Sequence, residues 1–276
     1  MTDLPLVAVI QFPGSNCEYE TARAAASSGL ESRVFRWNQW RQLRDSSPVA
    51  YILPGGFSFQ DRIRAGAVAS KERIMDLVFE KAEDGVPVLG ICNGAQILVE
   101  SGLVPGWNAG RVEAALAANA VSGRTGYLSS WVFVKTSSET GRKCPWLRDV
   151  GTGPIPLPIA HAEGRFAFRG ADAARLPEST GLTYCDHEGV VRDEYPVNPN
   201  GSVLNMAAAL NPRGNVLAMM PHPERAYWIW QLPPWIPSEW GDRRADAAVR
   251  GDISRTRGPG ARLFDSLASF LKGDPS

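Results

Sequence analysis

The sequence predicts an α/β fold with a doubly wound, mostly parallel sheet, and three observations support this prediction. Short apolar runs alternate along the chain with longer segments whose apolar residues recur every three or four positions. The runs end in turn residues, most distinctly at Gly55-Gly56 and at residues 90–94. Strands that alternate with helices form parallel sheets, and the functional loops of such sheets gather at the carboxyl ends of the strands.

The first part of the chain contains the clearest elements. Its apolar runs predict strands at residues 6–10, 34–37, 49–53 and 87–91. A helix is expected from about residue 18, with Ser15 or Asn16 as its N-terminal cap and Gly29 as its stop. A second helix is expected over residues 70–83, because its apolar side chains fall on one face.

The second half of the chain is less regular. Strands are predicted at residues 130–135, 156–160 and 216–220, whereas residues 111–130 show no continuous strand pattern. After Arg225 the composition changes to a stretch rich in tryptophan and proline, then to an Arg/Asp/Gly-rich segment, and residues 261–272 show helical spacing. We therefore expect one domain at residues 1–226 and a carboxyl-terminal extension ending in a helix at residues 227–276.

Charge and composition exclude several classes of protein. The formal net charge is zero, so neither nucleic acid nor an anionic membrane is expected as a partner. No apolar run reaches the roughly 18 residues of a membrane span, and residues 1–11 fit a first strand better than a signal peptide. The four cysteines form neither a C-x-x-C pair nor a disulfide framework, which indicates free thiols and a cytoplasmic protein.

Residues 90–94, Gly-Ile-Cys-Asn-Gly, form a G-x-C-x-G motif between a predicted strand and a predicted helix. A sharp strand-to-helix turn strains its central residue and needs neighbours without a Cβ, as in the G-x-S-x-G nucleophile elbow. The residue at this turn, Cys92, lies at a helix N-terminus, where backbone N–H groups favour a thiolate. We interpret Cys92 as a nucleophile and the Asn93 N–H as a donor to an oxyanion. A buried, inert cysteine between two packing glycines is the alternative for this motif alone.

A cysteine nucleophile needs a base and a third group that orients the base. The sequence has three histidines, and His222 lies in Met-Pro-His-Pro-Glu-Arg directly after the last predicted strand. Proline favours extended geometry in the residue before it, and residues two apart in an extended chain project to the same side. His222 and Glu224 can therefore form an oriented imidazole–carboxylate pair. The alternative is a turn that carries a surface charge pair.

These residues suffice for hydrolysis of a carboxamide. Cys92 attacks the carbonyl carbon, and the N–H groups of Asn93 and of the Gly55-Gly56 loop stabilise the oxyanion. His222 protonates the leaving ammonia and then activates the water that hydrolyses the thioester. This half-reaction needs no metal and no organic cofactor.

Three motifs make the sequence similar to the class I glutamine amidotransferases, which have a flavodoxin-like fold: Pro-Gly-Gly after the third strand, residues 90–98, and Pro-His-Pro-Glu after the last strand. Within that superfamily it most resembles the glutaminase components of phosphoribosylformylglycinamidine synthase, an enzyme of purine biosynthesis. The narrower resemblance rests on residues 12–17, 53–59, 64–67, 90–98, 158–164, 198–202 and 219–225.

This resemblance implies a function for the chain and roles for its residues. Cys92, His222 and Glu224 would form the catalytic triad, and the glutamine pocket would be lined by Gly55, Gly56, Phe57 and Gln96. Ammonia would pass to a partner synthetase subunit, which uses ATP and Mg²⁺ to convert formylglycinamide ribonucleotide into the amidine, often with a small bridging subunit. No cofactor is expected in this chain. The tail after Arg225 is longer than a minimal glutaminase subunit requires.

Other interpretations remain open on the sequence alone. The alternative functions are an amidotransferase subunit of another pathway, a stand-alone cysteine-elbow hydrolase and a non-catalytic binding subunit. His161 could contact substrate, line an ammonia exit or serve a structural role. Cys185 and His187 are two potential metal ligands without a second pair. Cys17 is expected to pack rather than to act as a reactive thiol. The Trp-rich extension is expected to fold onto its own domain, with one edge facing a partner.

Overall fold

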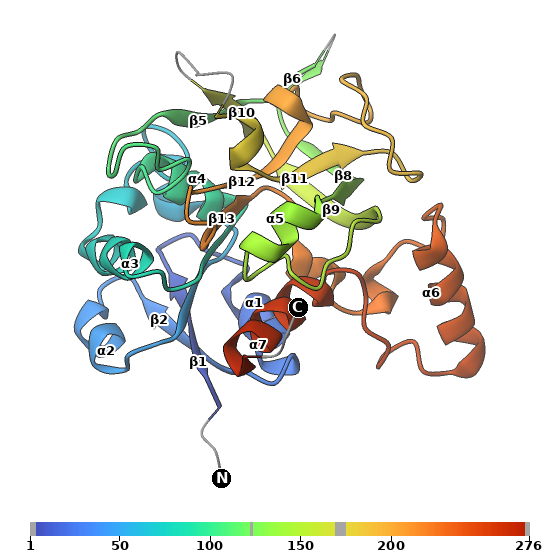
Figure 1. Ribbon diagram of the computed structural model, residues 1–276, viewed down its shortest axis with the longest axis horizontal. Helices are drawn as coiled ribbons and strands as arrows, with labels where there is room; N and C mark the ends of the chain where they lie inside the picture. The colour runs from blue at the N-terminus through green and yellow to red at the C-terminus, as the bar shows by residue number, and fades with distance from the viewer. Residues whose placement is uncertain (1–3, 122–123, 169–174, 274–276) are drawn as a thin grey trace.

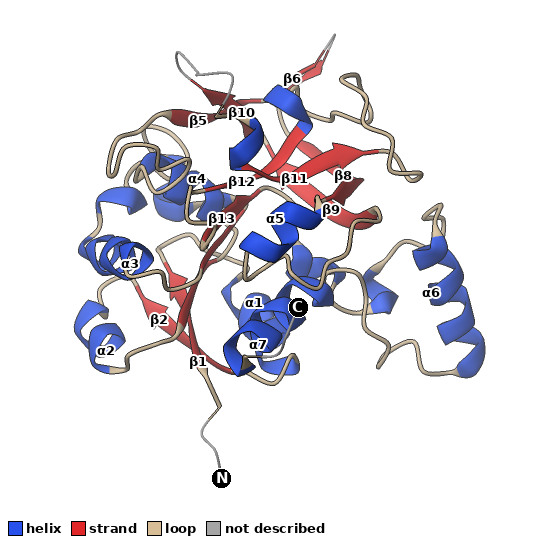
Figure 2. Ribbon diagram, viewed as in Figure 1, coloured by secondary structure: helices blue, strands red, loops and turns tan. Residues whose placement is uncertain are grey.

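A nine-stranded sheet runs through the computed structural model, which describes residues 4–121, 124–168 and 175–273 (Figures 1 and 2). From one edge to the other the strands are β2 (Glu31–Arg36), β1 (Leu6–Gln11), β3 (Ala50–Leu53), β4 (Val88–Ile91), β13 (Val216–Met219), β12 (Met206–Leu210), β11 (Thr180–Cys185), β8 (Leu128–Lys135) and β9 (Ile155–His161).

The two halves of this sheet differ in direction. The first five strands in the order pair in parallel, from β2 to β13. From β13 onward every pairing is antiparallel, through β12, β11 and β8 to β9. The strand order of the parallel half is that of a doubly wound, flavodoxin-like sheet, so the predicted fold class is confirmed.

Helices cover both faces of the parallel half. In Figure 1, α1 (Glu18–Ser27) and α7 (Ala261–Lys272) lie on one side of the sheet, and the other side carries α2 (Trp40–Asp45), α3 (Arg73–Glu83) and α4 (Asn93–Glu100). This double cover explains why β3, β4 and β13 are buried along their whole length and consist of apolar residues and glycine. The predicted face of α3 is the buried one.

Residues 111–121 form short strands rather than one continuous strand, as the sequence pattern indicates. Here β5 (Ala114–Ala118) pairs with β10 (Glu163–Phe168), and β6 (Ala120–Val121) pairs with β7 (Arg124–Thr125), outside the main sheet. A short helix, α5 (Ser138–Lys143), follows β8. Single 3₁₀ turns complete the described elements: η1 (Ser58–Asp61), η2 (Ala69–Lys71), η3 (Pro177–Ser179), η4 (Val203–Asn205), η5 (Pro223–Ala226) and η6 (Ile229–Gln231).

Three sequence expectations need correction or completion. Neither Ser15 nor Asn16 caps α1: Cys17 holds the N-cap position and makes no side-chain cap bond. The Arg/Asp/Gly-rich segment of the extension contains a helix, α6 (Glu239–Arg250), which Ser238 caps and which ends at left-handed Gly251. The alanine-rich β12 was not expected as a strand, since alanine favours helices, but its burial between two strands overrides that preference.

The carboxyl-terminal extension packs onto the rest of the chain. Trp240 of α6 and Phe264 of α7 are buried, and the Tyr227 ring meets the Phe264 ring edge to face. Trp230 and Trp235, in contrast, are 51% and 67% exposed. The extension therefore contributes to the core and also presents two aromatic side chains to its surroundings. The division of the chain at residue 226 stays a prediction.

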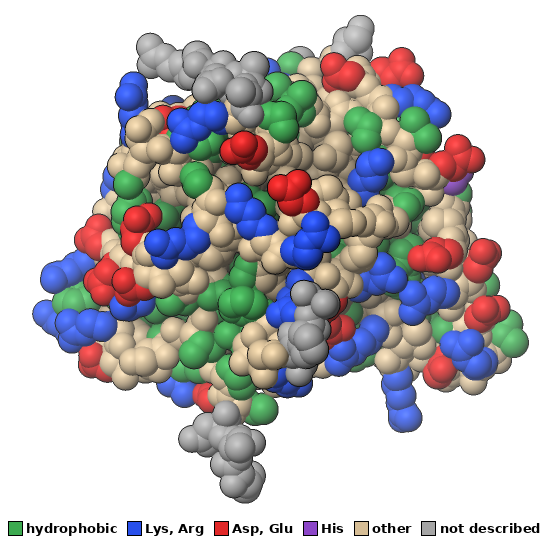
Figure 3. Space-filling view, viewed as in Figure 1, with side chains coloured by type: hydrophobic (Ala, Val, Ile, Leu, Met, Phe, Trp, Pro, Cys, Tyr) green, Lys and Arg blue, Asp and Glu red, His purple; other side chains and the backbone are tan. Residues whose placement is uncertain are grey.

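The surface carries both signs of charge. Figure 3 shows Lys and Arg side chains interspersed with Asp and Glu over one face, in keeping with the zero net charge. Among the described residues, no helix combines the length and the hydropathy that a membrane crossing needs.

A substitution at Gly94 tests how tightly α4 packs against β3. A Cβ on Gly94 would overlap the carbonyl oxygen and carbon of Leu53, which belong to the backbone and cannot turn aside. We expect Gly94→Ala to lower the free energy of unfolding by about 3 kcal/mol, the upper end of typical overpacking costs. Urea denaturation measures this change. Gly153→Ala is the control, because a Cβ there meets nothing within 4 Å; an equal, small effect of both substitutions would contradict the packing argument.

Candidate active site

Cys92 occupies a strained turn between β4 and α4. Its backbone has φ 51° and ψ −104°, in the positive-φ region that side chains rarely adopt. The Cys92 N–H donates to the Met219 carbonyl at 2.8 Å, so the turn is tied to the end of β13. A Cβ on Gly90 would lie 2.6 Å from the Gly94 carbonyl oxygen. The predicted elbow and its reason for needing both glycines are confirmed.

The predicted pairing of His222 with Glu224 is also confirmed. His222 follows β13 in extended conformation, with φ −103° and ψ 92°, and its N–H donates to the Pro158 carbonyl at 2.9 Å. Its Nδ1 donates to Glu224 Oε1 at 2.6 Å, and both side chains are buried. Within the described part of the chain His222 Nε2 has no hydrogen-bond partner. Nε2 is therefore the ring nitrogen available for proton transfer.

The first of the two glycines after β3 makes room for this pair. A Cβ on Gly55 would lie 2.7 Å from His222 Cε1, so any larger residue would displace the imidazole. Gly56 has φ 146° and bridges to Ser15 in the loop after β1. Gly55 therefore supports the histidine, and Gly56 joins the third-strand loop to the first.

Burial and charge act on His222 in opposite directions. Burial lowers the pKa of the imidazole, but the Glu224 carboxylate and the Cys92 thiol, together with Cys17, raise that pKa well above its ordinary value of 6.5. The Glu224 carboxylate therefore stabilises the imidazolium that forms when His222 takes up a proton. An imidazolium in this position can protonate a leaving group.

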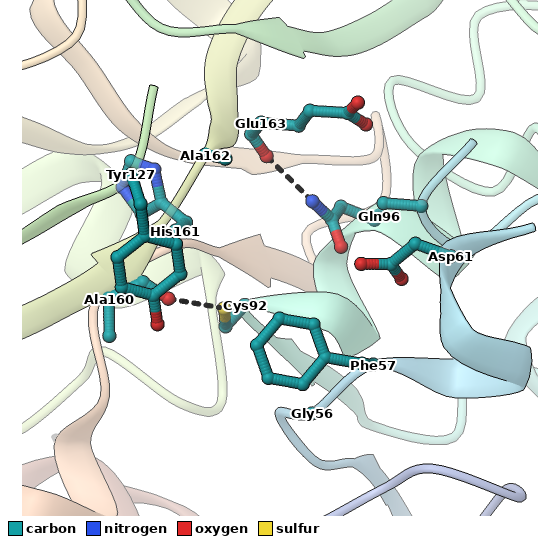
Figure 4. Close-up of a pocket in the computed structure, with 11 residues that line it drawn as sticks. Gly56, Phe57, Asp61, Cys92, Gln96, Tyr127, Ala160, His161, Ala162 and Glu163 are labelled. Atoms are coloured by element: carbon teal, nitrogen blue, oxygen red, sulfur yellow. Dashed lines mark hydrogen bonds between the residues drawn. The ribbon is translucent and has the colours of Figure 1, made fainter. Parts of the chain in front are cut away.

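A small cavity of about 80 Å³ opens beside Cys92 (Figure 4). Of the residues predicted to bind substrate, Gly56, Phe57 and Gln96 line it, whereas Gly55 and Asn93 do not. The Cys92 thiol donates to the Ala160 carbonyl at 3.6 Å. Gln96 is held by its own Nε2, which donates to the Glu163 carbonyl at 2.6 Å.

The side chain of Asn93 supports the cavity wall from behind. Its Oδ1 accepts from the Ser58 N–H at 3.0 Å, and its Nδ2 donates to Gln96 Oε1 at 2.9 Å and to Asp61 Oδ1 at 3.4 Å. The Asn93 side chain is therefore bonded within the protein, and its role in binding substrate stays a prediction. Its backbone N–H as an oxyanion donor stays a prediction.

Several residues of the cavity were not expected from the sequence: Asp61, Ala65, Tyr127, Ala160, Ala162 and Glu163. Asp61 ends a run of left-handed residues that begins at Phe59, and this run turns its carboxylate toward Gln96 (Figure 4). Burial, and then the neighbouring Glu163, raise the pKa of Asp61. No local pattern indicates such a turn, because none of its residues is glycine.

His161 lies in the wall of the cavity. Burial, and then the charge of His222, lower its pKa to about 3, so the ring is neutral. Nδ1 lies 3.1 Å from Asn119 Oδ1, which is an acceptor, so Nδ1 carries the proton. Nε2 has no partner within the described residues. His161 thus has a structural bond on one nitrogen and an acceptor free on the other.

The arrangement does not favour a metal ion. Among the described residues, one group of three ligand types lies close together, Cys17, His222 and Glu224, with ligand atoms within 4.8 Å of one another. Two of these side chains already bond to each other, and Arg225 Nη2 lies 3.1 Å from the Cys17 sulfur. A guanidinium at that distance opposes a second cation. Cys185 is buried, His187 is exposed, and they belong to no such group.

Comparison with known proteins identifies close relatives. Residues 4–270 match the family described as the CobB/CobQ-like glutamine amidotransferase domain. The chain is 42% identical over 278 residues to phosphoribosylformylglycinamidine synthase subunit PurQ of Methanothrix thermoacetophila, covering 96% of this chain and 98% of the relative. PurQ of Pyrococcus horikoshii is 41% identical over 79% of this chain and 88% of the relative. The Methanothrix alignment is long enough to include most of the extension.

A solved structure agrees with these matches. A chain in the structure of PurLQS from Thermotoga maritima superposes with a TM-score of 0.69 at 30% identity, covering 97% of this chain and 99% of that chain. The similarity therefore includes the sheet, the elbow and the extension together.

The charge state of His222 can be tested through Glu224. The raised pKa of His222 stabilises the fold fully below its ordinary pKa, and this contribution is lost as pH rises through the raised value. We expect Glu224→Gln to lower the pKa of His222, so that the ring titrates at lower pH and this pH-dependent stability disappears. NMR titration of the three histidine rings, with unfolding followed between pH 6 and 9, measures both effects. The exposed Glu188→Gln is the control; an unchanged His222 titration in Glu224→Gln would contradict the assignment.

Proposed function

Because the chain belongs to the CobB/CobQ-like glutamine amidotransferase family, we propose that it is the glutaminase subunit of phosphoribosylformylglycinamidine synthase. The observation that supports this most directly is that Cys92 and His222, which is paired with Glu224, line one small pocket, and Cys92 also lines the adjoining cavity. The relatives that match over nearly the whole chain carry the name of this subunit. The reaction is hydrolysis of glutamine to glutamate and ammonia.

The first chemical step forms a thioester. The carboxamide of glutamine lies against Cys92, whose sulfur attacks the carbonyl carbon as the thiol proton passes to His222 Nε2. The oxyanion accepts from two backbone N–H groups. One belongs to Asn93 at the start of α4, and the other to Gly56, because the next N–H along that loop, of Phe57, already donates to the Gly14 carbonyl at 2.9 Å.

The second half of the reaction releases both products. The His222 imidazolium, oriented by Glu224, protonates the leaving nitrogen, and ammonia departs. Water then attacks the thioester while His222 accepts its proton, which frees glutamate and restores the thiol. Thiol, imidazole and carboxylate supply every group these steps require, so we propose no cofactor for this chain. ATP and Mg²⁺ are used by the synthetase.

The cavity has the polarity to select glutamine. The Asp61 carboxylate faces it, beside the amide of Gln96, and suits the α-ammonium group of an amino acid (Figure 4). The neutral His161 also lines the cavity. We propose that these side chains hold the amino-acid end of glutamine while its carboxamide reaches Cys92.

The ammonia is consumed by a partner subunit. The matching relatives are named as a subunit of the synthase, and the solved neighbour is an assembly named PurLQS. We propose that this chain associates with the synthetase subunit and a small bridging subunit. There, ATP activates formylglycinamide ribonucleotide for attack by ammonia. Four free thiols and the pathway favour a cytoplasmic location.

Reconstitution tests the proposed function. We expect the complete synthase to form the amidine from glutamine only when this chain is present, and Cys92→Ser to reduce that rate by at least about a thousandfold. Ammonium chloride supplied in place of glutamine should restore synthesis with the Cys92→Ser chain. Product formation is followed by ADP release and by chromatography of the ribonucleotides. Glutamine-dependent synthesis that survives the substitution would overturn the nucleophile assignment.

Asp61 provides a test of the glutamine site. Removing one charge-assisted bond costs about 1.5–3 kcal/mol, so we expect Asp61→Asn to raise the KM for glutamine roughly tenfold to a hundredfold with a much smaller change in kcat. Steady-state glutamate production measures both constants. Asp45→Asn, on the exposed surface of α2, should change neither. A fall in kcat at unchanged KM would place Asp61 in the chemistry rather than in binding.

A further inference from the structure

A second thiol lies next to the catalytic pair, on the loop between β1 and α1. The N–H groups of Asn16 and Cys17 both donate to the Gly55 carbonyl, each at 3.3 Å, so this loop is fastened to the turn beneath His222. The Cβ position of Gly55 lies 3.1 Å from Cys17 Sγ and 2.7 Å from His222 Cε1. The thiol and the imidazole therefore crowd over the same glycine. Cys17 is 1% exposed.

The Cys17 thiol is held on both sides. It donates to Asn16 Oδ1 at 3.1 Å, and its sulfur accepts from Arg225 Nη2 at 3.1 Å. Arg225 Nε in turn donates to Glu20 Oε1 at 2.8 Å. These bonds connect the first loop and α1 to η5, the turn that carries Glu224. The sulfur cannot move without breaking its bonds to Asn16, on the same loop, and to Arg225, on η5.

His222 itself has less support. Its one short hydrogen bond runs from Nδ1 to Glu224 at 2.6 Å, and its other side-chain contacts are with the thiols of Cys17 and Cys92. A ring held at one atom can tilt about that bond, and misplacing a catalytic group by a small distance is costly in rate. Ligand atoms of Cys17, His222 and Glu224 lie within 4.8 Å of one another, so the sulfur lies beside the ring and limits its movement toward Cys17.

We propose that Cys17 is a positioning residue for His222, whose thiol, locked between Asn16 and Arg225, keeps the imidazole directed at Cys92. This inference rests on the proposed function and extends it to a residue outside the triad. The thiol suits the position because burial raises its pKa against the opposing effect of the His222 hydrogen bond, so it stays uncharged. A thiolate there would compete with Glu224 for the proton of His222.

The pH dependence of kcat distinguishes a positioning role of Cys17 from a merely structural role, which would leave it unchanged. The groups that face His222 come from several elements: Cys17, Cys92, Tyr127, His161, Glu224 and Arg225. Of these, Cys17 is among those that raise the pKa of His222. Substitution of Cys17 should therefore lower the pKa of His222. The imidazolium then loses its proton at a lower pH, and the rate should fall there as well.

Cys17→Ala in the complete synthase tests the proposal. We expect the kcat for glutamine hydrolysis to fall about tenfold or more, at unchanged KM, because Cys17 does not line the glutamine cavity. The alkaline limb of the kcat profile should move to lower pH. Cys17→Ser keeps a donor for Asn16 and an acceptor for Arg225 and should restore most of the rate. Cys185→Ala, another buried thiol, is the matched control.

A second variant covers the case in which Cys17→Ala does not fold, as judged by circular dichroism. Glu20→Gln weakens the hold on Arg225 from α1, which is partly exposed there, and should lower kcat in the same direction by about twofold to fivefold. A wild-type kcat and pH profile in both variants, or a rise in KM alone, overturns the positioning role. Wild-type synthase that hydrolyses no glutamine overturns the proposed function itself.

Discussion

Three adjacent parallel strands, β3, β4 and β13, end at the same edge of the sheet, and the backbone hydrogen bonds that pair them fix the candidate site. Leu53 pairs with Gly90, and Ile91 pairs with Met219. The residues that follow these strands therefore emerge side by side: the glycine loop, the cysteine elbow and the histidine turn. Parallel registers of this kind are set by buried strands, whose apolar side chains leave no alternative pairing. The strand register therefore places the three loops together, and only then can their side chains act on one substrate.

Close approach of backbones follows from that arrangement, and glycine makes it feasible. Gly94 lets α4 begin against the end of β3, Gly90 lets the elbow turn, and Gly55 leaves space for the imidazole. Each position is occupied so closely that a single added methyl group would meet backbone or ring atoms. Cys92 has a strained backbone conformation as a result, and the surrounding helix and strands hold it in that conformation.

Electrostatics then distinguish the two histidines of the site. Both are buried, and burial alone lowers the pKa of an imidazole. His222 has a carboxylate on one side and thiols close by, so its pKa is raised, whereas burial and the charge of His222 lower the pKa of His161, which bonds to the Asn119 amide. One ring is therefore suited to donate a proton, and the other stays a neutral acceptor. A buried imidazolium without Glu224 would be strongly disfavoured.

The sequence by itself determined the parts of this protein that are governed by local spacing. The elbow requires two glycines around Cys92, the proline-flanked His222 and Glu224 project together because they are two residues apart, and the central strands are apolar because both faces are covered. Tertiary structure alone decided the rest. Asp61 reaches the cavity through a left-handed turn without glycine, and the first loop delivers Cys17 to the histidine only because it hydrogen-bonds to Gly55. Alanine-rich β12 is a strand because it hydrogen-bonds to β13 on one side and to β11 on the other. Such outcomes come from contacts between residues far apart in the chain, whose energies no short window of sequence contains.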